Sequence, residues 1–249
     1  MSFRLLLVAL VCGVFSSFSQ ATVVVSSLKE QAEGWVSSVS ASYAASSSTV
    51  EKTEYKGSFR SSNNNDQRQW LMFGELEYGE VDGTKNADSQ LVHGRYIRKH
   101  VVDELNFEGF IQNESDDFAK LASRRLYGGG LSWQDKRDNL ALHVMLGVMD
   151  EREEHATDAS QNRQLTRATS SVQLQYQLDN QALLTSVLYF QPALNDFGDY
   201  RSTFKANFAF PMTQSLNINI GYSWRYNGEA FVGVPPIKRA LTTGISYSF

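Results

Sequence analysis

The sequence is short of three features that stabilise or anchor many proteins: cysteine, proline and long apolar runs. It has one cysteine, Cys12, and four prolines among 249 residues. A single cysteine allows no disulfide within the chain, so burial and backbone hydrogen bonds must hold the fold together. No segment after Ala21 approaches the roughly 20 consecutive apolar residues of a membrane-spanning helix. These absences exclude a disulfide scaffold and a helical membrane bundle.

The first residues follow the pattern of a secretory signal peptide. A charged start that contains Arg4 precedes an apolar run too short to span a bilayer, and Ser19-Gln20-Ala21 forms a small-x-small cleavage site. We expect cleavage after Ala21, which also removes Cys12. The expected organisation is a signal peptide over residues 1–21, a periplasmic segment over 22–33 and one domain over 34–249.

Strong charge of either sign is also missing. Lysine and arginine number 23 against 27 acidic residues, for a net charge of −4. A nucleic-acid partner would favour a strongly basic chain, so none is expected. The mean hydropathy of −0.33 is compatible with a membrane β-barrel, because a barrel strand exposes only every second side chain to lipid.

What the sequence does have, from Gly34 onward, is alternation of apolar and polar side chains with a period of two. Leu216, Ile218 and Ile220, for example, are separated by asparagines. This period is typical of strands with one apolar face. We expect strands near residues 34–46, 50–60, 67–79, 88–98, 103–112, 119–133, 139–149, 165–178, 182–191, 200–210, 216–226 and 241–249. The predicted fold is all-β, an antiparallel up-and-down transmembrane β-barrel of about 12 strands.

The connections between the expected strands alternate in length. Short turns are expected at 62–66, 99–102, 134–138, 179–181 and 211–213, and longer polar loops at 80–87, 150–164, 192–199 and 227–236. Outer-membrane barrels alternate short periplasmic turns with longer outside loops in this way. Aromatic residues near strand ends, such as Trp70 and Trp224, fit two interfacial girdles. A soluble barrel or sandwich that uses the same apolar face as its core is the alternative.

The chain ends in Gly244-Ile245-Ser246-Tyr247-Ser248-Phe249, which resembles the terminal assembly signal of outer-membrane proteins. The residues that carry this signal are Ile245, Tyr247 and Phe249, and the resemblance implies recognition by the outer-membrane assembly machinery. We expect the last strand to pair with the first to close the barrel, since an open edge in lipid leaves backbone groups unsatisfied.

Several motifs spread along the chain resemble the salt-induced outer-membrane proteins, an uncharacterised family of outer-membrane β-barrels. They are Glu33-Gly34-Trp35, Asp116-Asp117-Phe118, Arg124-Arg125, Gly128-Gly129-Gly130-Leu131, Gly147-Val148-Met149-Asp150-Glu151-Arg152-Glu153 and Val234-Pro235-Pro236-Ile237-Lys238-Arg239. The chain departs from the family at two loop positions. It has Ser46-Ser47-Ser48-Thr49 where relatives often have a Gly-Asn-Thr turn, and Arg239-Ala240 where an acidic residue is common. The resemblance implies a twelve-stranded barrel in the cell outer membrane of a Gram-negative bacterium, and it implies no demonstrated substrate.

Enzymatic residues are sparse. None of the four histidines lies in the His-x-Ser spacing of a barrel lipase or deacylase, so we expect no enzyme and no cofactor. His155 lies in an acidic run that we interpret as a solvated loop, and His143 as a hydrogen-bonded residue of the lumen. The glycines at 128–130 lack the Lys-Ser/Thr of a phosphate loop, and we interpret them as a bend in the wall. A barrel enzyme acting on lipid or peptide, and a surface-binding module using residues 150–164, are the alternatives.

The expected inner face carries charges of both signs. The candidate lumen residues are Glu54, Lys56, Arg60, Glu75, Glu77, Glu108, Arg124, Arg201, Lys205 and Arg225. Such side chains can line a narrow channel or bridge across the lumen and fill it, and both alternatives stay open. The expected role is a structural or envelope-stress barrel or a narrow, weakly ion-selective channel for small solutes, in contact with outer-membrane lipids.

Overall fold

The computed structural model describes residues 33–47, 51–179, 181–213 and 216–247. These residues form one sheet of 12 antiparallel strands, in which each strand pairs with the next along the chain. Two short 3-10 helices, η1 Asp117–Ala119 and η2 Ala159–Gln161, lie between strands. The strands are β1 Gly34–Ser47, β2 Glu51–Asn64, β3 Arg68–Val81, β4 Thr84–Val102, β5 Leu105–Asp116, β6 Leu121–Lys136, β7 Leu140–His155, β8 Arg163–Gln177, β9 Leu183–Pro192, β10 Tyr200–Pro211, β11 Leu216–Asn227 and β12 Ile237–Tyr247.

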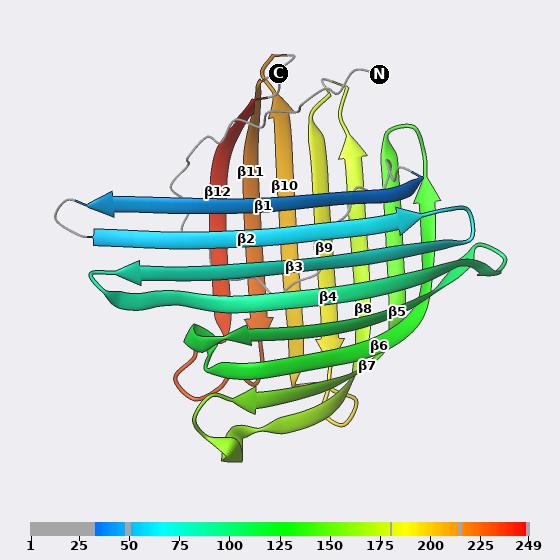
Figure 1. Ribbon diagram of the computed structural model, residues 1–249. Helices are drawn as coiled ribbons and strands as arrows, with labels where there is room; N and C mark the ends of the chain where they lie inside the picture. The colour runs from blue at the N-terminus through cyan, green and yellow to red at the C-terminus, as the bar shows by residue number, and fades with distance from the viewer. Residues whose placement is uncertain (1–32, 48–50, 180, 214–215, 248–249) are drawn as a thin grey trace.

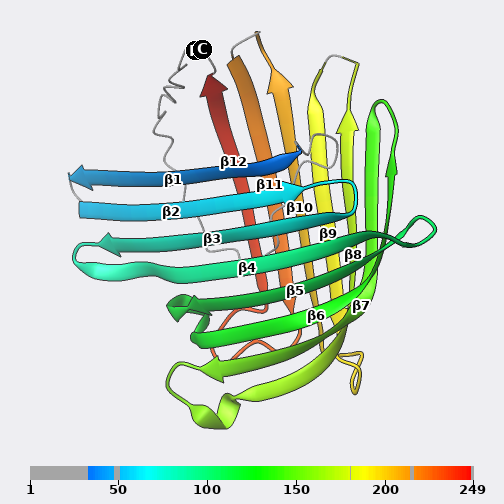
Figure 2. The ribbon, with the colours of Figure 1, turned by 45° about the vertical axis from the view of Figure 1, so that its right-hand side comes forward.

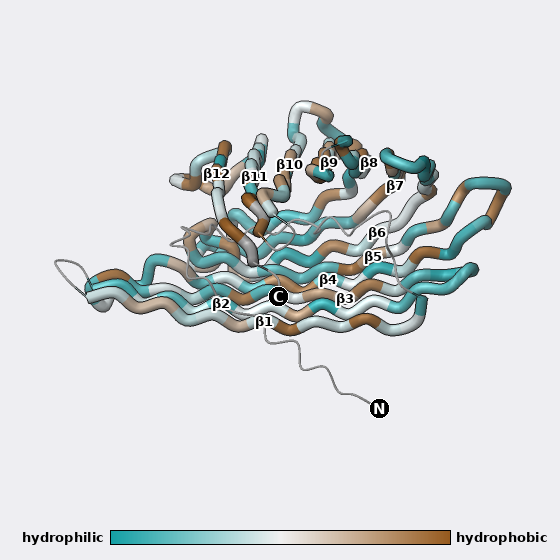
Figure 3. The backbone as a smooth tube through the Cα atoms, turned by 90° about the horizontal axis from the view of Figure 1, so that it is seen from above, coloured by the Kyte–Doolittle hydropathy of each residue, from teal (hydrophilic) through white to brown (hydrophobic). Residues whose placement is uncertain are grey.

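The polarity of the two faces of the sheet is the reverse of that in a soluble protein: many buried side chains are polar, and many exposed ones are apolar. In β8, Ser171 and Gln173 are buried, whereas Val172 between them is 44% exposed. In β7, Leu146 is 64% exposed. The alternation is visible along the strands in Figure 3. A water-soluble sheet normally buries its apolar face, so this one is turned inside out.

The sheet curls into two facing layers. Strands β1 to β6 run across one layer and β8 to β12 across the other, while β6 and β7 turn from one layer into the other (Figures 1 and 2). Gly129, Gly130 and Gly147 lie at this turn. Gly130 of β6 pairs with Gly147 of β7, and Gly129 pairs with Val148, the residue after Gly147. A Cβ atom on Gly129 would lie 2.7 Å from the Glu108 carbonyl oxygen, and one on Gly130 would meet the Leu146 carbonyl oxygen. The absent side chains therefore allow the wall to bend.

Three expected connections differ from the structure, and one of them, at 150–164, is shortened because β7 extends to His155. The expected long loop at 80–87 is a tight turn at Asp82-Gly83, whose φ angles are 49° and 71°. Positive φ at both central residues matches the twist of a hairpin, so a two-residue turn suffices there. The expected turn at 99–102 belongs to β4, which continues through an irregularity in its pairing to Val102.

The expected pairing of the last strand with the first is not present in the described part of the chain. There β1 pairs with β2 and β12 pairs with β11, so the two strands are the edges of the sheet. In Figures 1 and 2 β1 runs across β12 rather than alongside it, and a ladder needs parallel or antiparallel alignment. Phe249 and the expected signal peptide lie outside the described residues.

The remaining predicted assembly residues lie on β12. Ile245 pairs with Ile218 of β11 and is 58% exposed, which places it on the apolar outer face. Tyr247 ends the strand opposite Leu216. Among the described residues no helix is long and apolar enough to span a membrane.

Candidate functional site

The inner face of the sheet carries a network of eight charged side chains, seven of which are buried. It contains equal numbers of arginines and acids, which come from β5, β6, β7, β8 and β10 and, for Asp199, from the connection directly before β10. We call these eight residues the lumen network: Arg124, Arg163, Arg167, Arg201, Glu114, Glu151, Glu153 and Asp199. Period-two alternation on neighbouring strands brings them to one face, and the equal number of charges makes the network formally neutral.

Glu151 lies at the centre of the lumen network and is 1% exposed. It forms ion pairs with Arg124 at 2.7 Å, with Arg201 at 3.2 Å and with Arg167. Arg167 is fully buried, and its Nη2 donates to both carboxylate oxygens of Asp199 at 3.1 Å. Charges buried to this degree are tolerated when each has hydrogen-bonded partners of opposite sign.

The network extends from Glu151 to both sides. Glu153 forms ion pairs with Arg201 and Arg163, each at 2.7 Å, and Glu114 accepts a hydrogen bond from Arg124 at 2.9 Å. The partners come from strands of both layers, so the network bridges the lumen rather than lining one wall.

The acidic run after Met149 was expected to be a solvated loop, and this is wrong for Glu151 and Glu153. Strand β7 continues to His155, so alternate members of the run face inward. Four arginines supply the compensating charge, which the acidic run by itself does not indicate. The run from Asp150 to His155 is polar throughout, so the alternation of apolar and polar side chains that marks the other strands is absent from it.

A second buried group lies around Glu108. His143 Nε2 lies 2.5 Å from the Glu108 carboxylate and Arg95 lies 3.7 Å from it. His143 thus has the hydrogen bond expected of a lumen histidine. His93 Nδ1 lies 3.0 Å from Gln112 Oε1, between the rings of Phe73 and Phe110.

The other predicted lumen residues lie apart from these clusters. Lys56 forms ion pairs with Glu54 and, at 3.5 Å, with Glu77 of β3. Arg60 and Glu75 are half-buried on neighbouring strands. Lys205 is half-buried on β10. Of the ten predicted residues, the structure therefore brings Arg124 and Arg201 into the lumen network.

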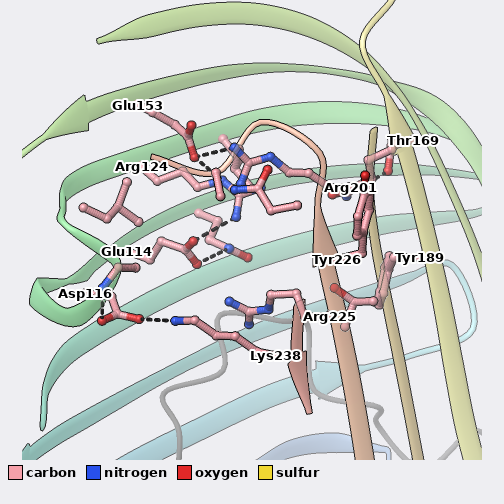
Figure 4. Close-up of a pocket in the computed structure, with 18 of the residues that line it drawn as sticks. Glu114, Asp116, Arg124, Glu153, Thr169, Tyr189, Arg201, Arg225, Tyr226 and Lys238 are labelled. Atoms are coloured by element: carbon pink, nitrogen blue, oxygen red, sulfur yellow. Dashed lines mark hydrogen bonds and ion pairs between the residues drawn. The ribbon is translucent and has the colours of Figure 1, made fainter. Parts of the chain in front are cut away.

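A cavity of about 120 Å³ lies beside the lumen network. Arg95, Tyr189, Arg201 and Arg225 contribute to its wall, and Figure 4 shows Arg225 and Lys238 extending from adjacent strands. Arg225 of β11 pairs in register with Lys238 of β12, whose Nζ lies 3.5 Å from Asp116. Most of the polar wall residues were not predicted, because the cavity joins strands far apart in sequence.

The connection between β11 and β12 covers this cavity. We call residues 228–236 the lid; it contributes Ala230, Phe231, Val234, Pro235 and Pro236 to the cavity wall. Phe231 is 7% exposed and packs edge-on against the His155 ring, with centroids 4.8 Å apart. The Arg163 guanidinium lies 5.1 Å from the same phenyl ring.

Backbone contacts hold the lid at Gly228, Glu229 and Val232: the Gly228 amide donates to the Tyr200 carbonyl oxygen at 3.0 Å, and Arg163 donates to the Glu229 carbonyl oxygen. Lys120 donates to the Val232 carbonyl oxygen at 2.8 Å, and the Val232 amide donates to Gln161 at 3.2 Å. These contacts are few and mostly exposed, so the lid is joined to the barrel by a small number of replaceable interactions.

The described residues contain no cluster of three or more histidine, cysteine, aspartate or glutamate side chains arranged to hold a metal ion. The polar groups that the cavity wall offers are arginine, lysine, tyrosine, carboxylate, amide and hydroxyl side chains.

The architecture defines a class: an up-and-down sheet of 12 antiparallel strands with a polar interior. A family model described as a protein of unknown function, DUF481, matches residues 39–249, and the chain belongs to that family. A search of curated proteins finds no match to the chain.

Two solved structures are similar over most of their length. One, the NanC porin, is 14% identical with a TM-score of 0.48, and the similarity covers 86% of this chain and 99% of the porin chain. The other is the β domain of the Bordetella autotransporter BrkA, 14% identical with a TM-score of 0.30, covering 86% of this chain and 98% of its own.

Proposed function

We propose that this protein is an outer-membrane β-barrel whose lumen forms a narrow path for small polar solutes, closed at one end by the lid. The observation that carries the proposal is the cavity beside the lumen network, inside a sheet with a polar inner face and an apolar outer face. The signal-like N-terminus and the terminal aromatic pattern support export and delivery to the outer membrane.

The apolar outer face supports a lipid environment. Large side chains are exposed in the middle of the strands, such as Ile111 at 66% and Val148 at 54%. A soluble protein rarely exposes a contiguous apolar surface of this kind. Lipid chains would cover these side chains without the cost of exposing them to water.

The lumen network and the lid support a narrow path. The network occupies the interior beside the cavity with paired, buried side chains, so a wide aqueous channel has no room there. A solute can enter the cavity from the lid side when Phe231 leaves His155, because the lid forms that part of the cavity wall.

Currents across planar lipid bilayers test this proposal. Refolded protein should show small unit conductance, and Phe231→Ala should increase the fraction of time spent open, since the substitution removes the ring that fixes the lid. Val232→Ala is the matched control, because Val232 is 74% exposed in the same lid. Large porin-like currents from the wild type, or equal open fractions in both variants, would contradict it.

A structural role without transport is the second candidate. The neutral lumen network favours it, because fully paired charges across the lumen tie the two layers together. The resemblance to salt-induced outer-membrane proteins would make osmotic or ionic stress its trigger. The absence of any current from the wild type and from Phe231→Ala would favour this candidate.

A further inference from the structure

We infer that the cavity under the lid binds a small organic anion that carries both a carboxylate-type oxyanion and hydroxyl groups. This inference rests on the proposed function, because it names the class of solute that the narrow path would accept. Three features carry it: the acidic oxygens of the cavity are already engaged, two buried donors are not, and the volume is small.

The acids of the cavity wall already have partners. The two carboxylate oxygens of Glu114 accept from Arg124 at 2.9 Å and from Gln112 at 3.0 Å. The oxygens of Glu153 face Arg201 and Arg163, each at 2.7 Å. These carboxylates therefore have little remaining capacity to bind a cationic solute.

Some hydrogen-bond donors of the cavity wall, by contrast, have no partner. Within the described residues, Arg95 Nε and the Tyr189 hydroxyl lack a hydrogen-bond partner. Tyr189 is 7% exposed and the Arg95 side chain is 11% exposed, so little of either donor reaches solvent. A guanidinium has five N–H donors and no acceptor, so a buried oxyanion is the group that satisfies it.

The wall also offers a place for a hydroxyl group. Asn227 at the end of β11 has a buried side-chain oxygen without a hydrogen-bond partner among the described residues. If the amide is turned over, its nitrogen occupies the same place, and a hydroxyl can satisfy either atom because it donates and accepts. Thr169, Ser171 and Thr203 add further hydroxyls to the wall.

The volume limits the size of the solute. The cavity of about 120 Å³ is somewhat smaller than the dry cavity of about 150 Å³ that accepts benzene in another protein. A three- or four-carbon hydroxy acid has a suitable size, whereas an oligosaccharide would require the lid to move away.

Titration calorimetry on refolded, full-length mature protein in detergent tests this inference. The probes are D-glycerate, glycerol, which lacks the carboxylate, and inorganic phosphate, which has an oxyanion but no carbon-borne hydroxyls. D-glycerate should bind roughly 10- to 100-fold more tightly than glycerol, as expected for hydrogen bonds to a charged group. It should also bind more tightly than phosphate. Equal binding of D-glycerate and glycerol would show that the ligand needs no oxyanion. Tighter binding of phosphate than of D-glycerate would show that it needs no hydroxyl groups.

Two variants separate the cavity from other surfaces. Tyr189→Phe removes one unpaired hydroxyl and should weaken D-glycerate binding roughly three- to tenfold. Lys85→Gln is the control, since Lys85 lies at the β3–β4 turn with exposed partners, and should bind like the wild type. Equal weakening by both variants, or by neither, would overturn the assignment to this cavity.

Failure of this inference can be told apart from failure of the proposed function. If D-glycerate does not bind while small currents are seen in bilayers, the path stands and the solute class is wrong. If D-glycerate binds while no current passes through any variant, the cavity is a binding site in a closed barrel and the transport proposal is wrong.

Discussion

At the scale of single residues, the lumen depends on the compensation of buried charge. Arg167 is fully buried and contacts Glu151 and Asp199. Alternation in the sequence predicts Arg124 and Arg201 on the inner face, but it does not pair them with their acids. Pairing depends on the register between strands and on which strands face one another across the lumen, and neither follows from one strand's pattern.

Replacing Arg167 by alanine should destabilise the protein by about 3 to 5 kcal/mol, because two buried carboxylates lose their shared partner. Urea unfolding in lipid vesicles measures the free energy of unfolding. The control is Arg125→Ala, whose exposed pair with Glu154 at 3.5 Å should contribute about 1 kcal/mol or less. Similar losses for the two variants would show that the lumen network does not stabilise the fold.

In the loop that holds η2, Asp158 accepts hydrogen bonds from Ser160 and Gln161, which lower the pKa of its carboxyl group. A carboxyl group with a lowered folded-state pKa stabilises the fold above its ordinary pKa, and this contribution is lost as the pH falls through the lowered value. We expect the loop that holds η2 to loosen in acid, which amide exchange at Ser160 would detect by comparison with Asp158→Asn.

At the scale of elements, strand positions are predictable and their connections less so. Strand β8 was expected over 165–178 and spans Arg163–Gln177, because alternation marks a strand directly. Strand β4 was expected over 88–98 and spans Thr84–Val102. Its N-terminal end was misplaced because polar residues near a tight turn resemble a loop in composition, and its C-terminal end because the pairing is irregular between Arg98 and Val102.

The bend of β6 and β7 gives a prediction at this scale. A methyl group at position 130 would collide with the backbone of β7, so Gly130→Ala should prevent the wall from bending and impair folding. Gly94→Ala is the control, since its Cβ would meet Ile111 at an ordinary 3.4 Å. Heat-modifiable migration on gels reports the folded barrel. Equal migration of both variants with the wild type would show that the bend does not need glycine.

At the scale of the whole molecule, twelve strands and an inverted polarity could be predicted, whereas the closure of the barrel could not be placed. The described β1 and β12 remain edges of the sheet. Closure joins residues about 200 positions apart in sequence, and alternation within each strand carries no information on that contact.

The terminal residue gives a prediction for assembly in cells. Deletion of Phe249 should reduce the amount of protein in the outer membrane, if the assembly machinery reads the terminal aromatic pattern. Phe190→Ala removes an aromatic side chain that is 42% exposed on β9 and should assemble like the wild type. Membrane fractionation and protease accessibility measure how much of each variant reaches the outer membrane. Normal accumulation of the deletion variant would remove this support for the outer-membrane proposal.

The central claim is that the apolar face contacts lipid and the polar face encloses the lumen. The mature chain expected after cleavage has no cysteine, so a single fluorescent label can be attached at Val172→Cys or at Gln173→Cys, neighbours on β8 that are 44% and 3% exposed. In vesicles containing brominated lipids, which quench fluorophores on contact, the label at 172 should be strongly quenched and the label at 173 should not. Quenching at 173 but not at 172, or at neither position, would contradict the account.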